Sequence, residues 1–314
     1  MIYRLILTQT RLSWSNPISP YSPGGFLKPK RHSLNLLHLC HRIKDEIGDS
    51  WLGMVLFNFH DPETMLDKFT KLPDNMVSKI RKMRMRSRSL VMAPLDDDST
   101  RMQYSLASAL KLVPSLRLDI LTVVGGAFAS EEYDTLDRLV RDSNGWRELQ
   151  FYNRESHMLG FCCGPYHTAR KPQPSHWQGV MLDRDGPHSG SSVVIYRYKI
   201  DRHLVDLTPH STNWEPFEQK VPATAQCLEW MEFAYSEAEK PTLVIVKRGK
   251  GVEYREREGS PFIEQDFRRD MPGMTWGQIR EEYRRYVHTA AIRYPSDHVP
   301  DIREDQYDDV DCIR

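Results

Sequence analysis

Residues Tyr104 to Gly126 read YSLASALKLVPSLRLDILTVVGG and join a helical pattern to a strand pattern. The helical part has one apolar face, formed by Leu106, Ala109, Leu110 and Val113. Pro114 follows it and ends the helix, because proline lacks a backbone N–H. The run Leu118–Val124 is apolar, rich in β-branched residues and followed by two glycines. The stretch therefore predicts a helix, a break and a buried strand.

The same unit, a helix followed by a strand, recurs along most of the chain. Strand patterns lie near residues 57, 84, 121, 150, 195 and 245, and helical patterns occupy most intervals between them. One helix between consecutive strands makes the strands parallel, so the sequence predicts an α/β fold. Two architectures fit. One is an irregular leucine-rich-repeat-like solenoid of alternating helices and parallel strands, which we favour because the unit repeats. The alternative is an open α/β sheet.

The composition is that of an ordinary globular protein. The chain has 314 residues, 43 basic and 43 acidic side chains, and five cysteines. A net charge of zero argues against a nucleic-acid binder that works by bulk attraction. Five cysteines make no disulfide framework in a chain of this length, and no apolar run reaches the length of a membrane span. These features favour a cytoplasmic or nuclear protein that binds neither nucleic acid nor membrane.

Composition also divides the chain into segments. Residues 13–32 are rich in proline and glycine, which disfavour regular structure, and predict an exposed linker. Alternating helical and strand patterns define an α/β region over residues 33–290. Residues 291–314 are acidic and lack periodicity, so we expect a disordered tail. Residues 1–12 read as the end of a helix, with Ile2, Leu5 and Ile6 at helical spacing.

The segment KMRMRSR alternates basic with apolar side chains, and one parity carries Lys82, Arg84, Arg86 and Arg88. Met83 and Met85 occupy the other parity. Successive side chains of a strand point to opposite faces, so one face is predicted to be basic and the other apolar. Two interpretations remain. The basic face is either solvated and answered by the acidic residues 96–98, or it binds phosphate or an acidic peptide on the concave surface of a solenoid.

Three further groups contain residues that often carry chemistry. They are Cys162, Cys163 and His167; Gly125 and Gly126 with the turn 247–251; and Asp183, Asp185 and His188. Adjacent cysteines lack the paired spacing of a zinc site, so we interpret them as buried thiols. The glycine segments match neither phosphate-loop pattern and are interpreted as turns. The acidic loop gives only weak evidence for acid–base chemistry. We therefore expect no catalytic residue, cofactor or metal.

Three segments resemble fungal F-box-like proteins, a large family mostly described as proteins of unknown function. MIYRLIL at Met1–Leu7 is similar to the closing half of their motif, in which an LPxEIR-type opening runs into IYxxLL. Leu34–Ile43 resembles the LLxxCRxI helix that follows, and Val55–Met65 resembles an NxFxFxDPxxxxxFL segment. The resemblance covers roughly residues 1–160, with a weaker echo at 243–251. Since the LPxEIR opening is absent, residues 1–12 read as a remnant of the F-box-like helix.

The resemblance implies a non-enzymatic protein-interaction protein, a substrate adaptor of a ubiquitin ligase with an incomplete F-box. In that family the N-terminal motif docks on a Skp-type adaptor, and the region behind it holds a target protein. Carried onto this chain, the docking residues are Ile2, Leu5 and Ile6. The alternative is an enzyme on a doubly wound α/β sheet that binds a nucleotide or sugar phosphate. It would use the loops after the strands near residues 121 and 195.

Overall fold

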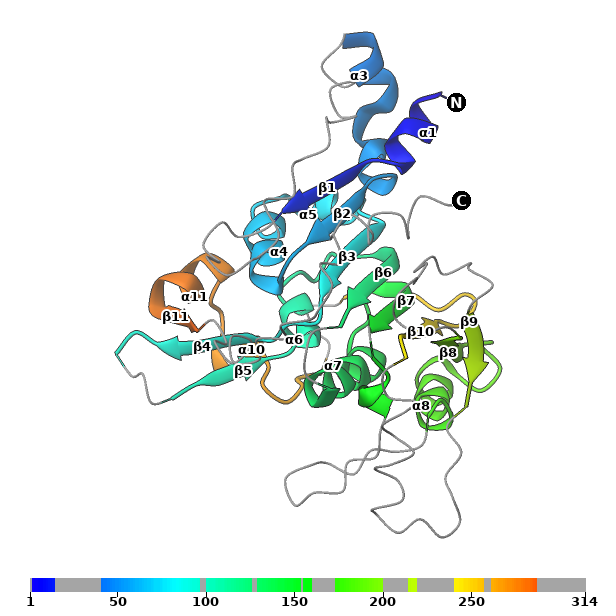
Figure 1. The fold of residues 1–314 in the computed structure, drawn as a ribbon. Coiled ribbons are helices and arrows are strands. Elements are labelled where there is room, and N and C mark those ends of the chain that lie inside the picture. Colours follow the sequence, from blue (N-terminus) through cyan, green and yellow to red (C-terminus); the bar gives the residue numbers. More distant parts are fainter. Residues whose placement is uncertain are drawn as a thin grey trace, which may run out of the picture.

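The computed structural model describes residues 2–14, 41–96, 100–125, 129–153, 155–159, 173–199, 214–218, 240–256 and 261–286. The main sheet contains the strands β1 (Arg11–Trp14), β2 (Leu56–Phe59), β3 (Lys82–Arg86), β6 (Leu118–Val124), β7 (Trp146–Asn153), β8 (Ser192–Tyr198), β9 (Trp214–Phe217) and β10 (Thr242–Lys247). Their order across this 8-stranded sheet is β1-β2-β3-β6-β7-β10-β8-β9 (Figure 1). The predicted α/β class is therefore confirmed.

The architecture is an open sheet, and a leucine-rich-repeat-like solenoid is not shown. β1, β2, β3, β6 and β7 pair in parallel and follow one another in sequence order. β10 then runs antiparallel to both β7 and β8, and β9 is antiparallel to β8. Continuous parallel stacking, which a solenoid requires, ends at β7. The alternative that the sequence left open is the one that the structure supports.

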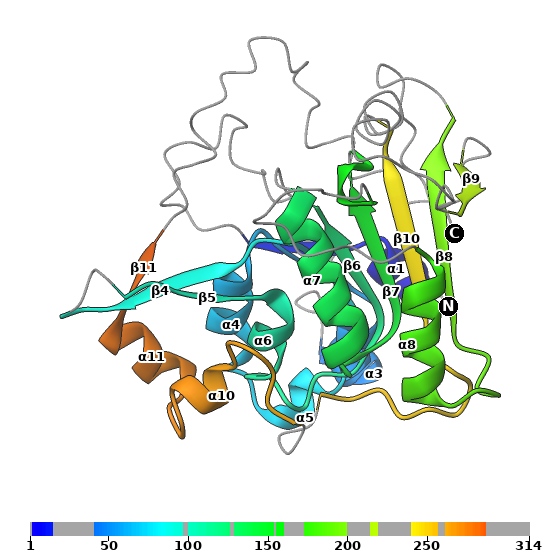
Figure 2. The same ribbon diagram turned by 90° about the horizontal axis from the view of Figure 1, so that it is seen from below.

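The helices and 3-10 helices of the main body and N-terminus are α1 (Ile2–Thr8), α3 (His41–Ile47), η2 (Gly48–Gly53), α4 (Pro62–Phe69), α5 (Asp74–Val77), α6 (Leu106–Leu110), α7 (Ala129–Asp142), η3 (His157–Leu159) and α8 (Ser175–Asp185). Figure 2 shows α4, α6, α7 and α8 in a row over one face of the sheet. Parallel connections that always step to the next strand place their helices on the same face, because crossovers share one hand.

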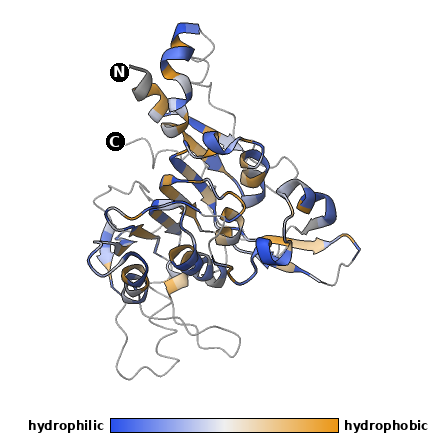
Figure 3. Cartoon of the chain, turned by 180° about the vertical axis from the view of Figure 1, so that it is seen from behind, coloured by the Kyte–Doolittle hydropathy of each residue, from blue (hydrophilic) through white to orange (hydrophobic). Residues whose placement is uncertain are grey.

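Local sequence signals explain where these elements begin. In α4, the Asp61 side chain caps the helix by accepting a hydrogen bond from the Thr64 backbone N–H at 2.8 Å. Pro62 occupies the first turn, where no N–H is needed. β6 spans Leu118–Val124, the residues predicted from the sequence. The core lies between the helices and the sheet, and Figure 3 shows hydrophobic and hydrophilic bands alternating along the strands.

A second sheet was not predicted. Its three antiparallel strands, in the order β11-β4-β5, are β4 (Leu90–Pro94), β5 (Met102–Tyr104) and β11 (Tyr283–Tyr286). Together with the helices α10 (Phe267–Asp270) and α11 (Trp276–Glu282) it forms an arm beside the main sheet (Figure 2). Helix α11 therefore ends at Glu282, and the chain continues as β11. Trp276 Nε1 donates to Asp67 of α4 at 2.8 Å and fastens the arm to the main body.

The segment 13–32, expected to be a linker, begins inside a strand. Ser13 and Trp14 belong to β1, which pairs with β2. The Trp14 ring stacks on Phe59 at a centroid distance of 5.0 Å, so packing of the indole draws these residues into the sheet. The rest of that segment and the acidic tail 291–314 lie outside the described residues. β9 lies in a stretch for which the sequence predicted no strand.

Candidate functional site

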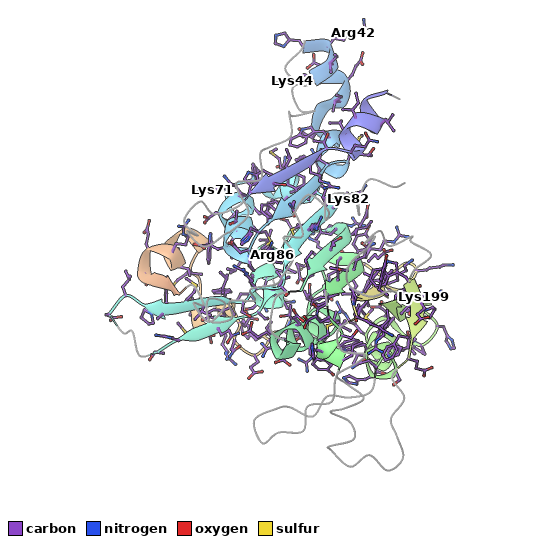
Figure 4. The ribbon with its side chains drawn as sticks, viewed as in Figure 1. Arg42, Lys44, Lys71, Lys82, Arg86 and Lys199 are labelled. Atoms are coloured by element: carbon purple, nitrogen blue, oxygen red, sulfur yellow. The ribbon has the colours of Figure 1, made fainter. Side chains whose placement is uncertain are left out.

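β3 places the basic side chains singled out in the sequence on one face of the main sheet. Met83 and Met85 are buried in the core between sheet and helices. Lys82, Arg84 and Arg86 therefore point to the opposite face, since side chains alternate along a strand. We call this surface, opposite α4, α6, α7 and α8, the basic face. Figure 4 shows Lys82 and Arg86 along β3.

The members of this row differ in exposure. Lys82 and Arg86 are half-buried, whereas Arg84 is only 8% exposed. Arg88 lies beyond the end of β3 and is exposed, so it does not continue the row within the strand. The predicted alternation is confirmed for the residues of β3, and the strand is shorter than the segment KMRMRSR.

The strands that flank β3 bring no acidic residue opposite these cations in the described register. On β2, Leu56 pairs with Lys82 and Asn58 pairs with Arg84. On the β6 side, the residues that pair with the row are Ile120, Thr122 and Val124. Three cations at alternate positions are thus flanked by uncharged side chains. Each of the three also takes part in an interaction within the protein beyond this register.

Polar side chains continue across the basic face on both sides of β3. Asn58 Nδ2 donates to Ser13 Oγ at 3.1 Å, and Thr122 Oγ1 donates to Gln150 Oε1 at 3.4 Å. Farther along, Gln150 Nε2 donates to Glu148 at 2.7 Å. Lys247 also approaches Glu148, at 3.6 Å. Glu148, on β7, thus has partners in Gln150 and Lys247 and marks the boundary of the basic row.

Beyond β7 the same face becomes aromatic. Tyr152, Tyr198, Trp214 and Leu243 form a second, small buried cluster, separate from the main core. The Trp214 ring makes edge contacts with Tyr198 at 5.1 Å and with Tyr152 at 6.3 Å. The sequence did not predict this cluster, because no strand pattern was identified at β9, which carries Trp214. Spaced aromatic residues at the strand ends were its only sequence signal.

The N-terminal helix α1 carries the second set of predicted partner-binding residues. Leu7 is 0% exposed and anchors α1 in the core, whereas Leu5 is 65% exposed. Two positions along a helix are about 200° apart, so Leu5 lies on the side away from the core. Ile6 is half-buried. The side chain of Ile2 lies outside the described residues.

At the carboxyl end of β6, the described side chains lie close to Gly125. A Cβ at Gly125 would lie 2.9 Å from Asn153 Oδ1 and 3.0 Å from Glu132 Oε1. Asn153 Nδ2 donates to the buried Glu132 carboxylate. These side chains occupy the space next to Gly125. Gly126 lies outside the described residues, as do Cys162, Cys163 and His167.

At the amino end of the sheet, Asp185 belongs to an ion pair. Its carboxylate, which is 0% exposed, accepts from Arg248 Nε at 2.9 Å and from the Gly249 backbone N–H at 2.8 Å. Asp183 and His188 are exposed, so the acid–base group suggested by the sequence is not assembled. Burial, together with the neighbouring Arg248 charge, lowers the pKa of Arg184 to about 10.

Glu256 lies in the segment that follows β10. It binds this segment to the residues that precede β6 and β7. One carboxylate oxygen accepts from Ser143 Oγ at 2.6 Å and from the Gly145 backbone N–H at 3.1 Å, and also from the Asn144 N–H. The other oxygen accepts from Lys111 Nζ at 2.9 Å. Lys111 and Glu256 are both buried. The hydrogen bonds of this group stay within the protein, which assigns it to stability.

Within the described part of the chain, no group of three or more histidine, cysteine, aspartate or glutamate residues could hold a metal ion. Among the described helices, none combines the length and the apolar composition that crossing a bilayer requires. The chain matches no protein-family model, no curated protein and no solved structure.

Proposed function

We propose that this chain is a non-enzymatic protein-interaction protein that acts as a substrate adaptor. In this proposal α1 docks on a Skp-type adaptor of a ubiquitin ligase, and the α/β region holds a target protein in the cytoplasm or nucleus. The observation that carries it is the exposure of Leu5 on a helix that Leu7 anchors from the other side. A large aliphatic side chain held outward on an anchored helix gains free energy when a partner covers it.

The rest of the α/β region supports a binding role. The basic face carries charges on strands, which hold side chains more rigidly than loops do. Asp185 and Glu256, two buried carboxylates of the described region, are engaged by Arg248 and Lys111. Lys82 and Arg86, which are half-buried, lie on one face of β3, an arrangement suited to contacting a surface.

The test is binding of the purified chain to a Skp-type adaptor, measured by biolayer interferometry. Leu5→Ser should weaken binding about tenfold, because an interface leucine contributes roughly 1.5 kcal/mol or more when buried. Leu95→Ser is the matched control, since Leu95 is also exposed, at 52%, and lies after β4 in the arm. Both variants should unfold at the wild-type temperature.

A second arm uses the chain extended at its N-terminus by an LPxEIR-type opening. If neither the chain nor the extended form binds the adaptor, the ligase part of the proposal is wrong. Equal losses in Leu5→Ser and Leu95→Ser would also refute a role for α1.

A further inference from the structure

We propose that Lys44 on α3 is an attachment site for a small ubiquitin-like modifier, a protein that is coupled to lysine side chains. Lys44 lies in the segment Ile43-Lys44-Asp45-Glu46, where an aliphatic residue precedes the lysine and a glutamate follows two positions later. Of the lysines in the sequence, only Lys44 has both neighbours. The conjugating enzyme of this modifier class contacts such a segment directly, with an apolar surface for the aliphatic residue and cations for the glutamate. Such a modification lies outside the proposed function and does not depend on it.

The helix α3 presents this segment to solvent. Short patterns match by chance in many proteins, so exposure decides whether an enzyme can use one. Lys44, Asp45 and Glu46 are exposed, and Ile43 is half-buried. α3 projects from the main body (Figure 1), and none of the described hydrogen bonds or ion pairs involves the Lys44 side chain. The Lys44 amine is therefore accessible to an approaching enzyme.

The Glu46 carboxylate has a partner within α3, and this partner holds it only weakly. Arg42 Nε donates to Glu46 Oε1 at 3.0 Å, from one turn earlier in the helix. The two side chains are 88% and 47% exposed, and water and salt screen an exposed pair of this kind. A cation of the conjugating enzyme can therefore take the place of Arg42 beside Glu46.

Recognition requires the segment to leave the helical conformation. Two positions along a helix are about 200° apart, so Lys44 and Glu46 do not reach one enzyme surface together while α3 is intact. In an extended chain the same two side chains lie on one side, about 7 Å apart. α3 has seven residues, of which Ile47 alone is buried. A helix this short is marginal without tertiary contacts, so residues 41–46 can unwind while Ile47 stays in the core.

The step that joins the two proteins is an acyl transfer. The modifier arrives as a thioester between its C-terminal carboxyl group and a cysteine of the conjugating enzyme. The Lys44 ammonium group first loses one proton to solvent. The resulting amine attacks the thioester carbonyl carbon and forms an amide bond, while the carbon–sulfur bond breaks. The leaving thiolate takes up the second proton of the amine, so no oxidant or reductant is needed.

The experiment incubates the full chain with the small ubiquitin-like modifier, its activating enzyme, its conjugating enzyme and ATP. Electrophoresis follows the product, and mass spectrometry of the digested product locates the branched peptide, which we expect at Lys44. Lys44→Arg should abolish this product, because arginine keeps the charge and lacks the nucleophilic amine. The matched control is Lys71→Arg, which should leave the product unchanged. Lys71 is also exposed (Figure 4), but it follows Thr70 and has Pro73 two positions later.

Three further variants test how the segment is recognised. Glu46→Gln should slow modification about tenfold, because a charge-assisted contact with the enzyme is lost. Asp45→Asn removes the neighbouring charge, which the enzyme does not contact, and should slow modification by less than about twofold. Arg42→Gly loosens α3 without altering the four recognised residues, and it should be modified at least as fast as the wild-type chain. Thermal unfolding of each variant should match the wild type, since these side chains are exposed.

Several results would overturn the proposal. One is the absence of a product, or a product whose branched peptide maps to another lysine. Another is an equal loss in Asp45→Asn and Glu46→Gln, which would indicate that general negative charge replaces specific recognition. Slower modification of Arg42→Gly would contradict recognition of an extended segment. Coupling of ubiquitin to Lys44 by its own enzymes, without coupling of the small ubiquitin-like modifier, would assign this lysine to a different modifier. None of these measurements uses the ligase adaptor, so the two proposals can fail separately.

Discussion

Replacing Glu256 with glutamine should destabilise the fold more than an ordinary buried substitution. The side chain is 0% exposed, and its two oxygens have separate tasks. One accepts from Ser143 Oγ and from the Asn144 and Gly145 backbone N–H groups, and the other accepts from Lys111 Nζ. A glutamine can keep the first set with its carbonyl oxygen. Its NH2 group then faces the Lys111 ammonium, so two donors meet and the lysine charge loses its carboxylate.

The size of the effect follows from that arrangement. Removing one partner of a buried ion pair costs about 3–5 kcal/mol, because the other charge stays buried without compensation. For a chain of this length about 2 °C is lost per kcal/mol, so the unfolding temperature should fall by about 6–10 °C. Lys111→Met should cost less, about 1–3 kcal/mol, because three hydrogen bonds still solvate the Glu256 carboxylate.

The assay is urea unfolding followed by tryptophan fluorescence and circular dichroism, applied to both single variants and to the double variant. Removing both charges eliminates the uncompensated lysine, so the double variant should be at least about 1 kcal/mol more stable than the sum of the single effects predicts. Additive losses would refute the view that Glu256 stabilises the fold through its ion pair with Lys111. A Glu256→Gln variant whose stability lies within about 0.5 kcal/mol of the wild type would refute it as well.

Substitutions at four further positions test other parts of the fold. Gly145→Ala should cost about 1–3 kcal/mol in urea unfolding, because its Cβ would lie 2.8 Å from Glu256 Cγ. Gly179→Ala, within α8 and with no atom within 4 Å of the added Cβ, should instead stabilise by about 0.5–1 kcal/mol. Burial raises the pKa of Asp142 above its ordinary 3.8, so folding disfavours the ionised form. Asp142→Asn should therefore raise the unfolding temperature at pH 7, and the gain should vanish as the pH falls below 3.8; a gain that persists in acid contradicts this cause. Asp61→Ala should lose about 1–2 kcal/mol with the cap on the Thr64 N–H, whereas Asp61→Asn should retain most of the stability.

Local signals in the sequence were sufficient to place single elements. The strand Leu118–Val124 has the predicted bounds, because an apolar β-branched run between Pro114 and two glycines has few other options. The start of α4 was likewise set by Asp61 and Pro62, which act on the backbone of the next few residues. Such signals depend on contacts within one turn, so neighbours in the fold do not alter them.

Pairing direction could not be predicted in the same way. The run Thr242–Lys247 reads as a buried strand in either direction, and its place between β7 and β8 depends on contacts with residues far away in sequence. β4, β5 and β11 were missed for a related reason. Tyr283–Tyr286 continues a helical pattern, and it becomes a strand because β4 offers an edge to pair with.

The sequence predicted which side chains of β3 share a face, but it did not predict which residues lie beside them. Alternation of methionine with lysine and arginine assigns the two faces of β3 from the sequence alone. The burial of Arg84 depends on the strands that pair with β3. The position of Leu56 and Ile120 beside Lys82 depends on the same strands. No local sequence pattern specifies which strands these are. The aromatic cluster around Trp214 was missed because its members come from four separate strands.

Packing explains why the basic row lies where it does, and it leaves the charge of the row unexplained. Met83 and Met85 must face the core, and a register shift of one residue would bury three cations beneath α4 and α6. This requirement is met by any polar side chains at positions 82, 84 and 86. Pairing with β2 and β6 therefore fixes which face of β3 is polar, and it does not fix which polar side chains occupy these three positions.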